Sequence, residues 1–277
     1  MNFSAQWHAL GTEAELAGSQ LALGVTALGR ADHMRLGDYT IAFFSLAIGL
    51  ERLGKLIVIA DYAIKNQGKF PDNKFLKDKV RHNLALLLDH CEAVSGTRQQ
   101  QLPSEHSKRP KDKVHQAIIQ NLSEFAIQTR YYNLDLVTGG KAPMPEEPVR
   151  AWWKRVGEPI LAQHYTARQK QKDKATADAL DESLREYVMV RHHSETGESI
   201  DDLAVLIRRD GASRVVQKYG RLYVLQIVRW LSYLIAVLAH EGGKHNIEPL
   251  FGVEEPFHVF WNDDRYFLRR KTWAIYF

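Results

Sequence analysis

Two arginine–histidine pairs in this chain combine residue types that could act beside a phosphate group. Arg109 precedes His115 by six positions, and Arg185 precedes His192 by seven. Histidine can transfer a proton near neutral pH because its unperturbed pKa is about 6.5. Arginine adds a permanent positive charge and a bidentate grip on phosphate. Each pair therefore combines a residue that can transfer a proton with a residue that can bind an anion.

The spacing alone does not select either pair. With 20 arginines and 12 histidines in 277 residues, roughly 2.6 pairs with four to six residues between them are expected by chance. Arg185 and His192 fall in a predicted helix, where a separation of seven places both side chains on one face. Arg109 precedes Pro110 in a predicted loop, and His115 follows in the first turns of the next helix. A solvated surface position is the alternative for each residue.

A second set of ionisable residues is spread over three predicted helices. Glu51 and Lys55 are four positions apart, His82 opens the following helix, and Arg130 ends a third beside Tyr131. Glu51 and Lys55 could form an ordinary helix ion pair that contributes roughly a few tenths of a kcal/mol. They could instead line a groove between helices together with the other residues of the set. Equally, His82 could be a helix-start or core histidine, and Arg130 a cation that stabilises a helix C-terminus.

The order of these residues resembles that of the HEPN domain, a four- to five-helix fold of prokaryotic ribonuclease toxins, phage-defence proteins and nucleotidyltransferase partners. In the nucleotidyltransferase-associated type, one helix reads alanine-x-glutamate-lysine-x-leucine-lysine, and Glu51 and Lys55 occupy comparable places. A histidine-aspartate-leucine opening is matched by residues 82–84, and a threonine-arginine-tyrosine-proline-aspartate segment by residues 129–133. The proline of that segment is missing, so the loop after Arg130 is expected to differ. The resemblance covers about half of the chain.

This resemblance implies a protein associated with RNA or a nucleotide in prokaryotic phage defence or a toxin-type system. We expect a non-catalytic binding or regulatory module; the alternatives are a metal-independent endoribonuclease and a structural helical subunit of a larger complex. In ribonuclease-active members, an arginine, four to six residues and a histidine act on the RNA 2′-hydroxyl and the scissile phosphate, usually across a dimer. The resemblance therefore also implies a homodimer or a larger complex, with a nucleotidyltransferase or another defence-system protein as a candidate partner.

Positive charge is unevenly distributed along the chain. The net charge is only +4, but Lys170, Lys172 and Lys174 belong to a basic segment that follows the aromatic residues Trp152 and Trp153. Basic patches beside aromatic residues can bind phosphate backbones and stack bases, although solvated helix faces have the same composition. We expect these lysines to contribute to RNA binding.

The composition is that of a soluble globular protein, with 45% hydrophobic and 25% charged residues. A single cysteine, Cys91, excludes an intramolecular disulfide and is typical of a reducing cytoplasm. The first residues show no signal-peptide pattern. Two apolar stretches, 41–60 and 223–239, contain charged residues such as Arg52 and Arg229, and a mid-bilayer arginine costs roughly 3 kcal/mol. The sequence therefore predicts a cytoplasmic protein without a membrane span.

No cofactor or metal site is expected. His240 and His245 flank a glutamate as in a zinc-protease helix, but the second histidine is one residue too late. At a separation of five, two side chains point about 140° apart, against about 40° at a separation of four. The chain also lacks a phosphate-binding glycine loop with the required lysine-serine/threonine ending.

Apolar residues recur with a helical period, which predicts an all-α fold. A HEPN-like domain (1–140) is expected to join a second helical region (150–277) through a proline-rich linker (141–149), and a short C-terminal hairpin is expected over 257–268. Ser199 is the predicted N-cap of its helix. Helices are predicted over 12–31, 39–66, 74–94, 111–130, 149–164, 175–193, 199–209 and 212–240.

Overall fold

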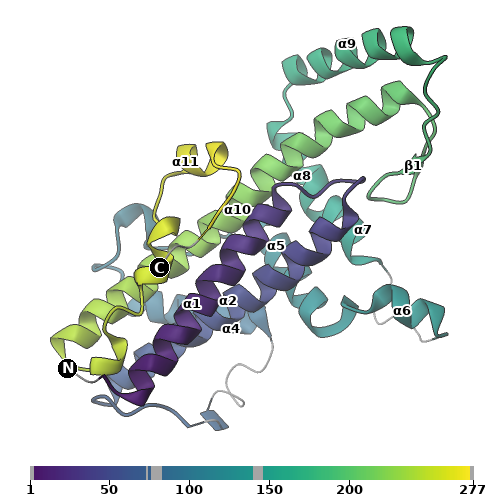
Figure 1. Cartoon of the computed structure of the whole chain (residues 1–277). Coiled ribbons are helices and arrows are strands. Elements are labelled where there is room, and N and C mark those ends of the chain that lie inside the picture. Colours follow the sequence, from purple (N-terminus) through teal and green to yellow (C-terminus); the bar gives the residue numbers. More distant parts are fainter. Residues whose placement is uncertain (1–2, 73, 76–82, 140–145, 275–277) are drawn as a thin grey trace.

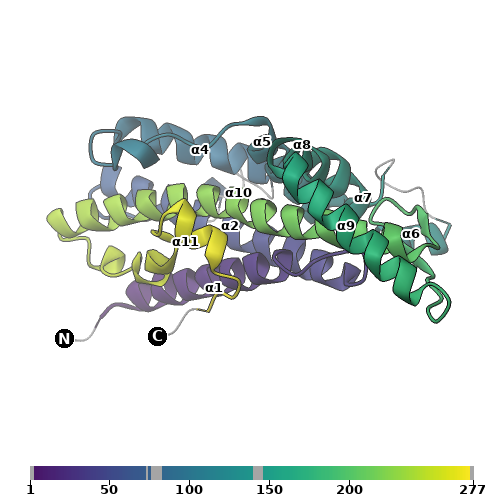
Figure 2. The same ribbon diagram turned by 90° about the horizontal axis from the view of Figure 1, so that it is seen from above.

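The computed structural model of the chain describes residues 3–72, 74–75, 83–139 and 146–274. In this part of the chain the fold is all-α, as predicted, with one short antiparallel strand pair. Three long helices form its centre: α1 (Ala5–Leu28), α2 (Leu36–Lys65) and α10 (Leu203–Lys244). They pack along one another, and the remaining elements surround them (Figures 1 and 2).

Two glycines allow α1 and α2 to approach closely. A Cβ at Gly24 of α1 would lie 2.6 Å from Cγ of Leu46, and a Cβ at Gly49 of α2 would lie 2.8 Å from Cγ of Leu21. Each helix therefore inserts a leucine over a glycine of the other. Side chains at both glycine positions would push the helices apart, which is why the close contact requires residues without a Cβ.

α4 (Leu84–Thr97) and α5 (Lys113–Glu124) pack against α2. Asn83 caps α4 and Asp112 caps α5, each accepting a hydrogen bond from a backbone N–H of the first turn. A short 3₁₀ turn, η1 (Ser104–His106), lies between these helices. α5 continues into one π-helical turn, η2 (Phe125–Thr129), followed by α6 (Tyr132–Val137). The helix predicted over 111–130 is confirmed; His82, the predicted opening residue of the preceding helix, lies outside the described residues.

A continuous helical stretch matches the prediction over 149–164. It consists of α7 (Pro148–Trp152), the π-helical turn η3 (Trp153–Gly157) and α8 (Glu158–His164). α9 (Ala167–Leu184) follows and contains the basic segment with Lys170, Lys172 and Lys174. It packs along the N-terminal part of α10, and these two segments extend beyond α1 and α2 as an arm (Figure 1). We refer to α9, residues 185–202 and the first turns of α10 as the α9–α10 arm.

The prediction of one helix over 175–193 is wrong. α9 ends at Leu184, and the chain then forms the antiparallel pair β1 (His192–His193) and β2 (Ser199–Ile200). Ser199 is therefore in a strand, and Asp202 is the residue that caps α10. A tertiary contact explains the difference. The carboxylate of Glu195, between the strands, accepts hydrogen bonds from side chains of α10, and a helix that continued through this segment would not allow that contact. The predicted separation of 199–209 from 212–240 is also absent, because α10 is continuous.

The segment 257–268 is helical rather than a hairpin, so the predicted place of the short hairpin is wrong. It contains the 3₁₀ helix η5 (Glu255–Phe260) and α11 (Asp264–Arg269), and a further 3₁₀ turn, η4 (Glu248–Leu250), precedes it. Asp263 accepts a hydrogen bond from the N–H of Tyr266 and caps α11. The aspartates that suggested a turn therefore start a helix.

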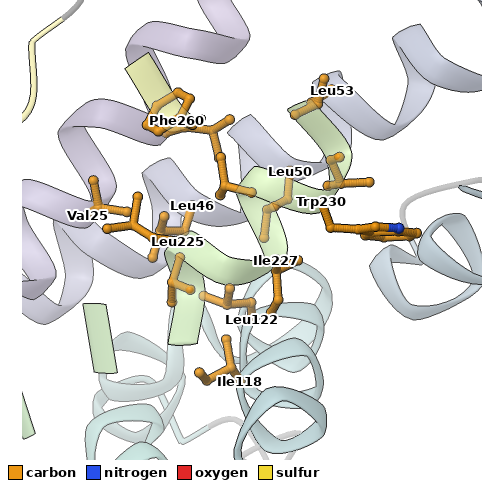
Figure 3. Close-up of a cluster of buried hydrophobic side chains, with 14 of the residues drawn as sticks. Val25, Leu46, Leu50, Leu53, Ile118, Leu122, Leu225, Ile227, Trp230 and Phe260 are labelled. Carbon is orange, nitrogen blue, oxygen red and sulfur yellow. The ribbon is translucent and has the colours of Figure 1, made fainter. Parts of the chain in front are cut away.

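One hydrophobic core runs through the bundle. Figure 3 shows Val25 of α1, Leu50 of α2, Leu122 of α5, Ile227 of α10 and Phe260 of η5 within one cluster. All five side chains are fully buried. Helices from both sides of the predicted 141–149 linker supply this core, so the predicted domain boundary does not coincide with a division of the core.

α10 alone among the described helices is long and apolar enough, by length and composition, to cross a membrane. In its most apolar 18-residue window, 78% of the residues are buried inside the bundle. The guanidinium of Arg229, within this stretch, donates to Asp264 of α11 at 2.8 Å and to the carbonyl of Asn262 at 2.9 Å. The position of α10 at the centre of the core thus accounts for its apolar composition.

Candidate ligand-binding groove

A groove of about 900 Å³ opens between α1, α2 and the π-helical turn η2. Its walls are largely apolar, with Phe44, Ile48 and Ile59 contributed by α2 and Phe125 and Ile127 by η2. Charged side chains join this apolar surface from three elements. They are Glu13 of α1, Glu51, Arg52 and Lys55 of α2, and Arg130 after η2.

The spacing of residues along α2 places them on the groove. Phe44, Ile48, Glu51, Lys55 and Ile59 recur every three or four positions, which is the spacing of one helical face. The opposite wall is the π-helical turn, whose five-residue hydrogen-bonding pattern interrupts the regular α-helix. Such π-helical turns are frequent at functional sites. The helix period of α2 and the irregular turn after α5 therefore build the groove together.

Two ion pairs occupy part of the groove. Lys55 pairs with Glu51 one helical turn away, and Arg52 pairs with Glu13 across the α1–α2 interface. Lys55 is 29% exposed and Glu51 21% exposed, so this pair is half-buried at the groove surface. Glu51 and Lys55 thus form a helix ion pair and also line an interhelix groove with Arg130. His82, the fourth residue of the predicted groove, lies outside the described residues.

Among the described residues that line the groove, Arg130 differs from the other two cations, Arg52 and Lys55. Within the described ranges no carboxylate forms an ion pair with its guanidinium. Its Cζ lies 5.3 Å from the ring centre of Tyr131, whose side chain is 57% exposed. An exposed arginine without a carboxylate partner, beside an aromatic ring and an apolar groove, is suited to bind an anionic ligand that also has an apolar or aromatic part.

The structure therefore brings together three of the predicted residues, Glu51, Lys55 and Arg130, with Tyr131 adjacent to Arg130. Glu13 and Arg52 were not expected. Glu13 lies about 40 positions before Arg52, and only the pairing of α1 with α2 makes them neighbours. Local sequence patterns carry no signal for such a contact.

Arg109 and His115 both serve the packing of the bundle. The Arg109 side chain is 8% exposed, and its Nη1 lies 2.7 Å from Asp89 and 3.5 Å from Glu92. His115 is buried, and its Nε2 lies 2.9 Å from the Gln226 side-chain oxygen. Burial lowers the pKa of His115 from its ordinary value of 6.5. Neither residue lines the groove.

Arg185 and His192 lie on different elements. Arg185 follows the last residue of α9, is 72% exposed and pairs with Asp181 of the same helix. His192 is in β1, and its ring stands edge-on to that of His33 with 6.2 Å between the ring centres. The predicted placement of Arg185 and His192 on one helical face is therefore wrong, because α9 ends before the strand begins.

The lysines of the basic segment do not line the groove. Lys170, Lys172 and Lys174 are exposed on α9. Nζ of Lys170 lies 5.5 Å from the ring centre of Tyr165. These lysines form a solvated basic surface on the α9–α10 arm, whose charge is available to a polyanion.

A buried polar cluster fastens the β1–β2 hairpin to α10 and contacts Trp153 of the bundle. Glu195, between β1 and β2, accepts hydrogen bonds from Nε of Arg209 at 2.7 Å and from the hydroxyl of Ser213 at 3.2 Å. The guanidinium of Arg209 also lies 3.7 Å from the ring centre of Trp153. Burial, followed by the nearby Glu195 carboxylate, raises the pKa of Tyr39 well above its usual range. Glu195 and Tyr39 are buried, Arg209 is 18% exposed, and the contacts of the cluster are structural.

In the described part of the chain, no group of three or more histidine, cysteine, aspartate or glutamate side chains is arranged to hold a metal ion. Glu241, which lies beside His240 in the zinc-protease-like segment, instead accepts a hydrogen bond from Arg98 at 2.6 Å. A comparison of the chain with protein-family models, curated proteins and solved structures finds no match. The chemistry of the groove is therefore the basis for a functional proposal.

Proposed function

We propose that the protein is a HEPN-like module that binds a nucleotide in the α1–α2–η2 groove, either as a free nucleotide or as the end of a single-stranded RNA, without cleaving it. The observation that carries the proposal is Arg130, a cation without a carboxylate partner among the described residues, at an apolar groove. Arginine binds phosphate oxygens in a bidentate manner. A biological setting in phage defence or a toxin-type system is what the HEPN resemblance implies.

The size and surface of the groove agree with a nucleotide. Its volume of about 900 Å³ lies within the range of roughly 300–1,000 Å³ that is usual for small-molecule sites. Phe44, Ile127 and Tyr131 offer apolar and aromatic surface for a base. The carboxylate of Glu13, which has acceptor positions beyond its ion pair with Arg52, can accept hydrogen bonds from ribose hydroxyls or exocyclic amino groups.

The charge of the groove favours one phosphate over several. Glu13 and Glu51 form ion pairs with Arg52 and Lys55, so among the described residues of the groove Arg130 supplies the positive charge that no carboxylate pairs. A triphosphate would bring its additional negative charges close to the two glutamates. We therefore expect a nucleoside monophosphate or a single RNA phosphate to bind more tightly in the groove than a nucleoside triphosphate.

A binding role is supported over cleavage by the positions of the histidines. None of the described residues that line the groove is a histidine. Arg109 and His115 are each held in buried structural contacts, and Arg185 and His192 are on different elements. If the purified protein cleaves RNA in the presence of EDTA, and if Arg185→Ala or His192→Ala abolishes that cleavage, the endoribonuclease alternative replaces the binding proposal.

The test compares two ligands, adenosine monophosphate and a labelled ten-residue oligoadenylate. Arg130→Ala should weaken binding of both by about tenfold or more, because a hydrogen bond to a charged group contributes roughly 1.5–3 kcal/mol. Arg130→Lys should restore part of the affinity for the monophosphate. Arg168→Ala, which removes an exposed arginine of α9, is the matched control and should leave monophosphate binding unchanged. Equal monophosphate affinity of wild type and Arg130→Ala would refute the assignment of the groove.

The basic surface of α9 should contribute to binding of the oligoadenylate but not to binding of the monophosphate. Replacing Lys170, Lys172 and Lys174 together with glutamine should flatten the salt dependence of oligoadenylate binding, since fewer counterions are released. The same variant should bind the monophosphate as the wild type does. The homodimer that the resemblance implies stays a prediction, which light scattering at micromolar concentration can test.

A further inference from the structure

The tip of the α9–α10 arm exposes a cluster of apolar side chains. Tyr187 is 82% exposed and Met189 is 84% exposed, in the segment between α9 and β1. Exposed apolar clusters on a soluble protein are typical of interaction sites. Four further side chains at this end of the arm are about 40% exposed: Leu180, Leu184, Val188 and Val205. We call these six residues the arm tip.

Hydrogen-bonded backbone presents three of these side chains, Tyr187, Val188 and Met189, at a hollow. The N–H groups of Tyr187 and Val188 both donate to the carbonyl of Leu184, which closes the end of α9 into a defined turn. Val190 is buried, and Asp202 caps α10 on the other side. A hollow of about 780 Å³ lies between this turn and the first residues of α10. It is large enough to accept apolar side chains from another chain.

The arm tip is negatively charged on a protein that is positively charged as a whole. Residues 180–190 and 201–205 contain five carboxylates and one guanidinium, whereas the whole chain has a net charge of +4. The guanidinium, that of Arg185, is already paired with Asp181. Glu182 and Glu186 are exposed and make no ion pair with another residue of the described chain. The five carboxylates are those of Asp181, Glu182, Glu186, Asp201 and Asp202.

This charge excludes two kinds of occupant and favours a third. RNA and anionic membrane surfaces would both be repelled by the carboxylates around the apolar residues. A protein segment with apolar side chains on one face and lysine or arginine beside them would satisfy both features of the surface. Tyrosine and methionine are suited to such a contact, because tyrosine is frequent at binding hot spots and methionine adapts to irregular surfaces.

We propose that the arm tip docks a cationic amphipathic helix of a partner protein, with its apolar residues in the hollow and its basic residues against Glu182, Glu186, Asp201 and Asp202. This is the helix-in-groove mode of recognition, in which residues at helical spacing act as anchors. The proposal does not depend on nucleotide binding, because the arm tip and the α1–α2–η2 groove share no lining residue. The arm would then recruit a protein to a module that binds its nucleotide elsewhere.

The test uses two labelled 14-residue peptides, an amphipathic helix of leucine and lysine and its counterpart of leucine and glutamate. Fluorescence anisotropy should show at least tenfold tighter binding of the lysine peptide. Tyr187→Ser with Met189→Ser, and separately Glu182→Gln with Glu186→Gln, should each weaken that binding about tenfold, as expected for hot-spot residues. Added salt should weaken it further, because the contact includes exposed charges.

Matched controls lie on α1. Leu16 and Leu23 are 42% and 47% exposed, and Leu16→Ser with Leu23→Ser should bind the lysine peptide as the wild type does, as should Glu15→Gln. All substituted residues are solvent-exposed, so circular dichroism should show unchanged helix content. Equal affinity for the two peptides, or unchanged affinity after the arm-tip substitutions, would overturn the proposal. So would light scattering in which Tyr187→Ser with Met189→Ser converts a dimer to a monomer, since a second copy of the chain would then occupy the tip.

Discussion

Replacing Glu195 with glutamine should reveal how strongly the Glu195–Arg209 pair fastens the short hairpin to α10. The Glu195 side chain has no solvent exposure, while its partner Arg209 is 18% exposed. Glutamine keeps the shape of the side chain and can still accept a hydrogen bond from Ser213. It removes the negative charge, and it leaves the guanidinium of Arg209 in a largely buried position against Trp153.

The expected cost follows from this burial. Removing one partner of a buried ion pair destabilises a protein by about 3–5 kcal/mol. Arg209 keeps partial access to water and its contact with the Trp153 ring. The expected loss of stability for Glu195→Gln is therefore at the lower end of this range, about 3 kcal/mol. A protein of this kind has a total stability of about 5–15 kcal/mol. We therefore expect the variant to fold but to unfold at a clearly lower urea concentration.

Urea unfolding followed by far-UV circular dichroism measures this change through the midpoint and the slope of the transition. Glu198→Gln, which removes an exposed carboxylate of the same hairpin, is the control and should change the free energy of unfolding by less than about 0.5 kcal/mol. In a double-mutant cycle with Arg209→Met, the double variant should be more stable than the sum of the single effects predicts. A loss below about 1 kcal/mol, or additive effects in the cycle, would refute the inference that this pair fastens the hairpin.

Three further predictions concern the core. A fragment of residues 1–140 should lack stable tertiary structure in circular dichroism and amide-exchange measurements, because it loses Ile227 and the rest of α10 from the shared core; a cooperatively unfolding fragment would contradict this. Because burial lowers the pKa of His115, the unfolded chain binds more protons just below pH 6.5, so the free energy of unfolding should fall as the pH drops below that value. His115→Gln should flatten this dependence between about pH 5 and pH 7, and an unchanged slope would count against it. Burial also raises the pKa of the Cys91 thiol, so Ellman's reagent should react with Cys91 only after denaturant is added; rapid reaction of the native protein would show that the site is open.

Several local features could be predicted from the sequence because neighbouring residues decide them. The 3.6-residue period identified the long apolar helices, and α2 begins and ends within three residues of its predicted bounds. The same period placed Glu51 and Lys55 on one face, where the structure has them. The sequence also placed Arg130 beside Tyr131 at the end of a helix, and their contact joins adjacent residues.

The errors occurred where distant contacts compete with local preference. The segment 257–268 has aromatic residues on both sides of residues 262–264, Asn-Asp-Asp, which suggests a hairpin. Phe257, Phe260 and Phe267 are instead buried in the core from helical segments. Residues 185–193 could continue a helix, yet the chain turns to bring Glu195 to Arg209. In both segments the burial of a few side chains against another helix outweighs the intrinsic preference of the backbone.

The sequence by itself determined the helical class of the protein and the faces of its helices, because side-chain spacing along a helix is a local property. Only the tertiary structure decided that Glu13 would join Arg52 at the groove, and that Arg185 and His192 would not share a helix. These outcomes depend on which helices pack together and where the chain turns. Helix packing and the positions of turns are determined by close contacts such as that of Gly24 with Leu46, and by buried ion pairs between residues far apart in the chain.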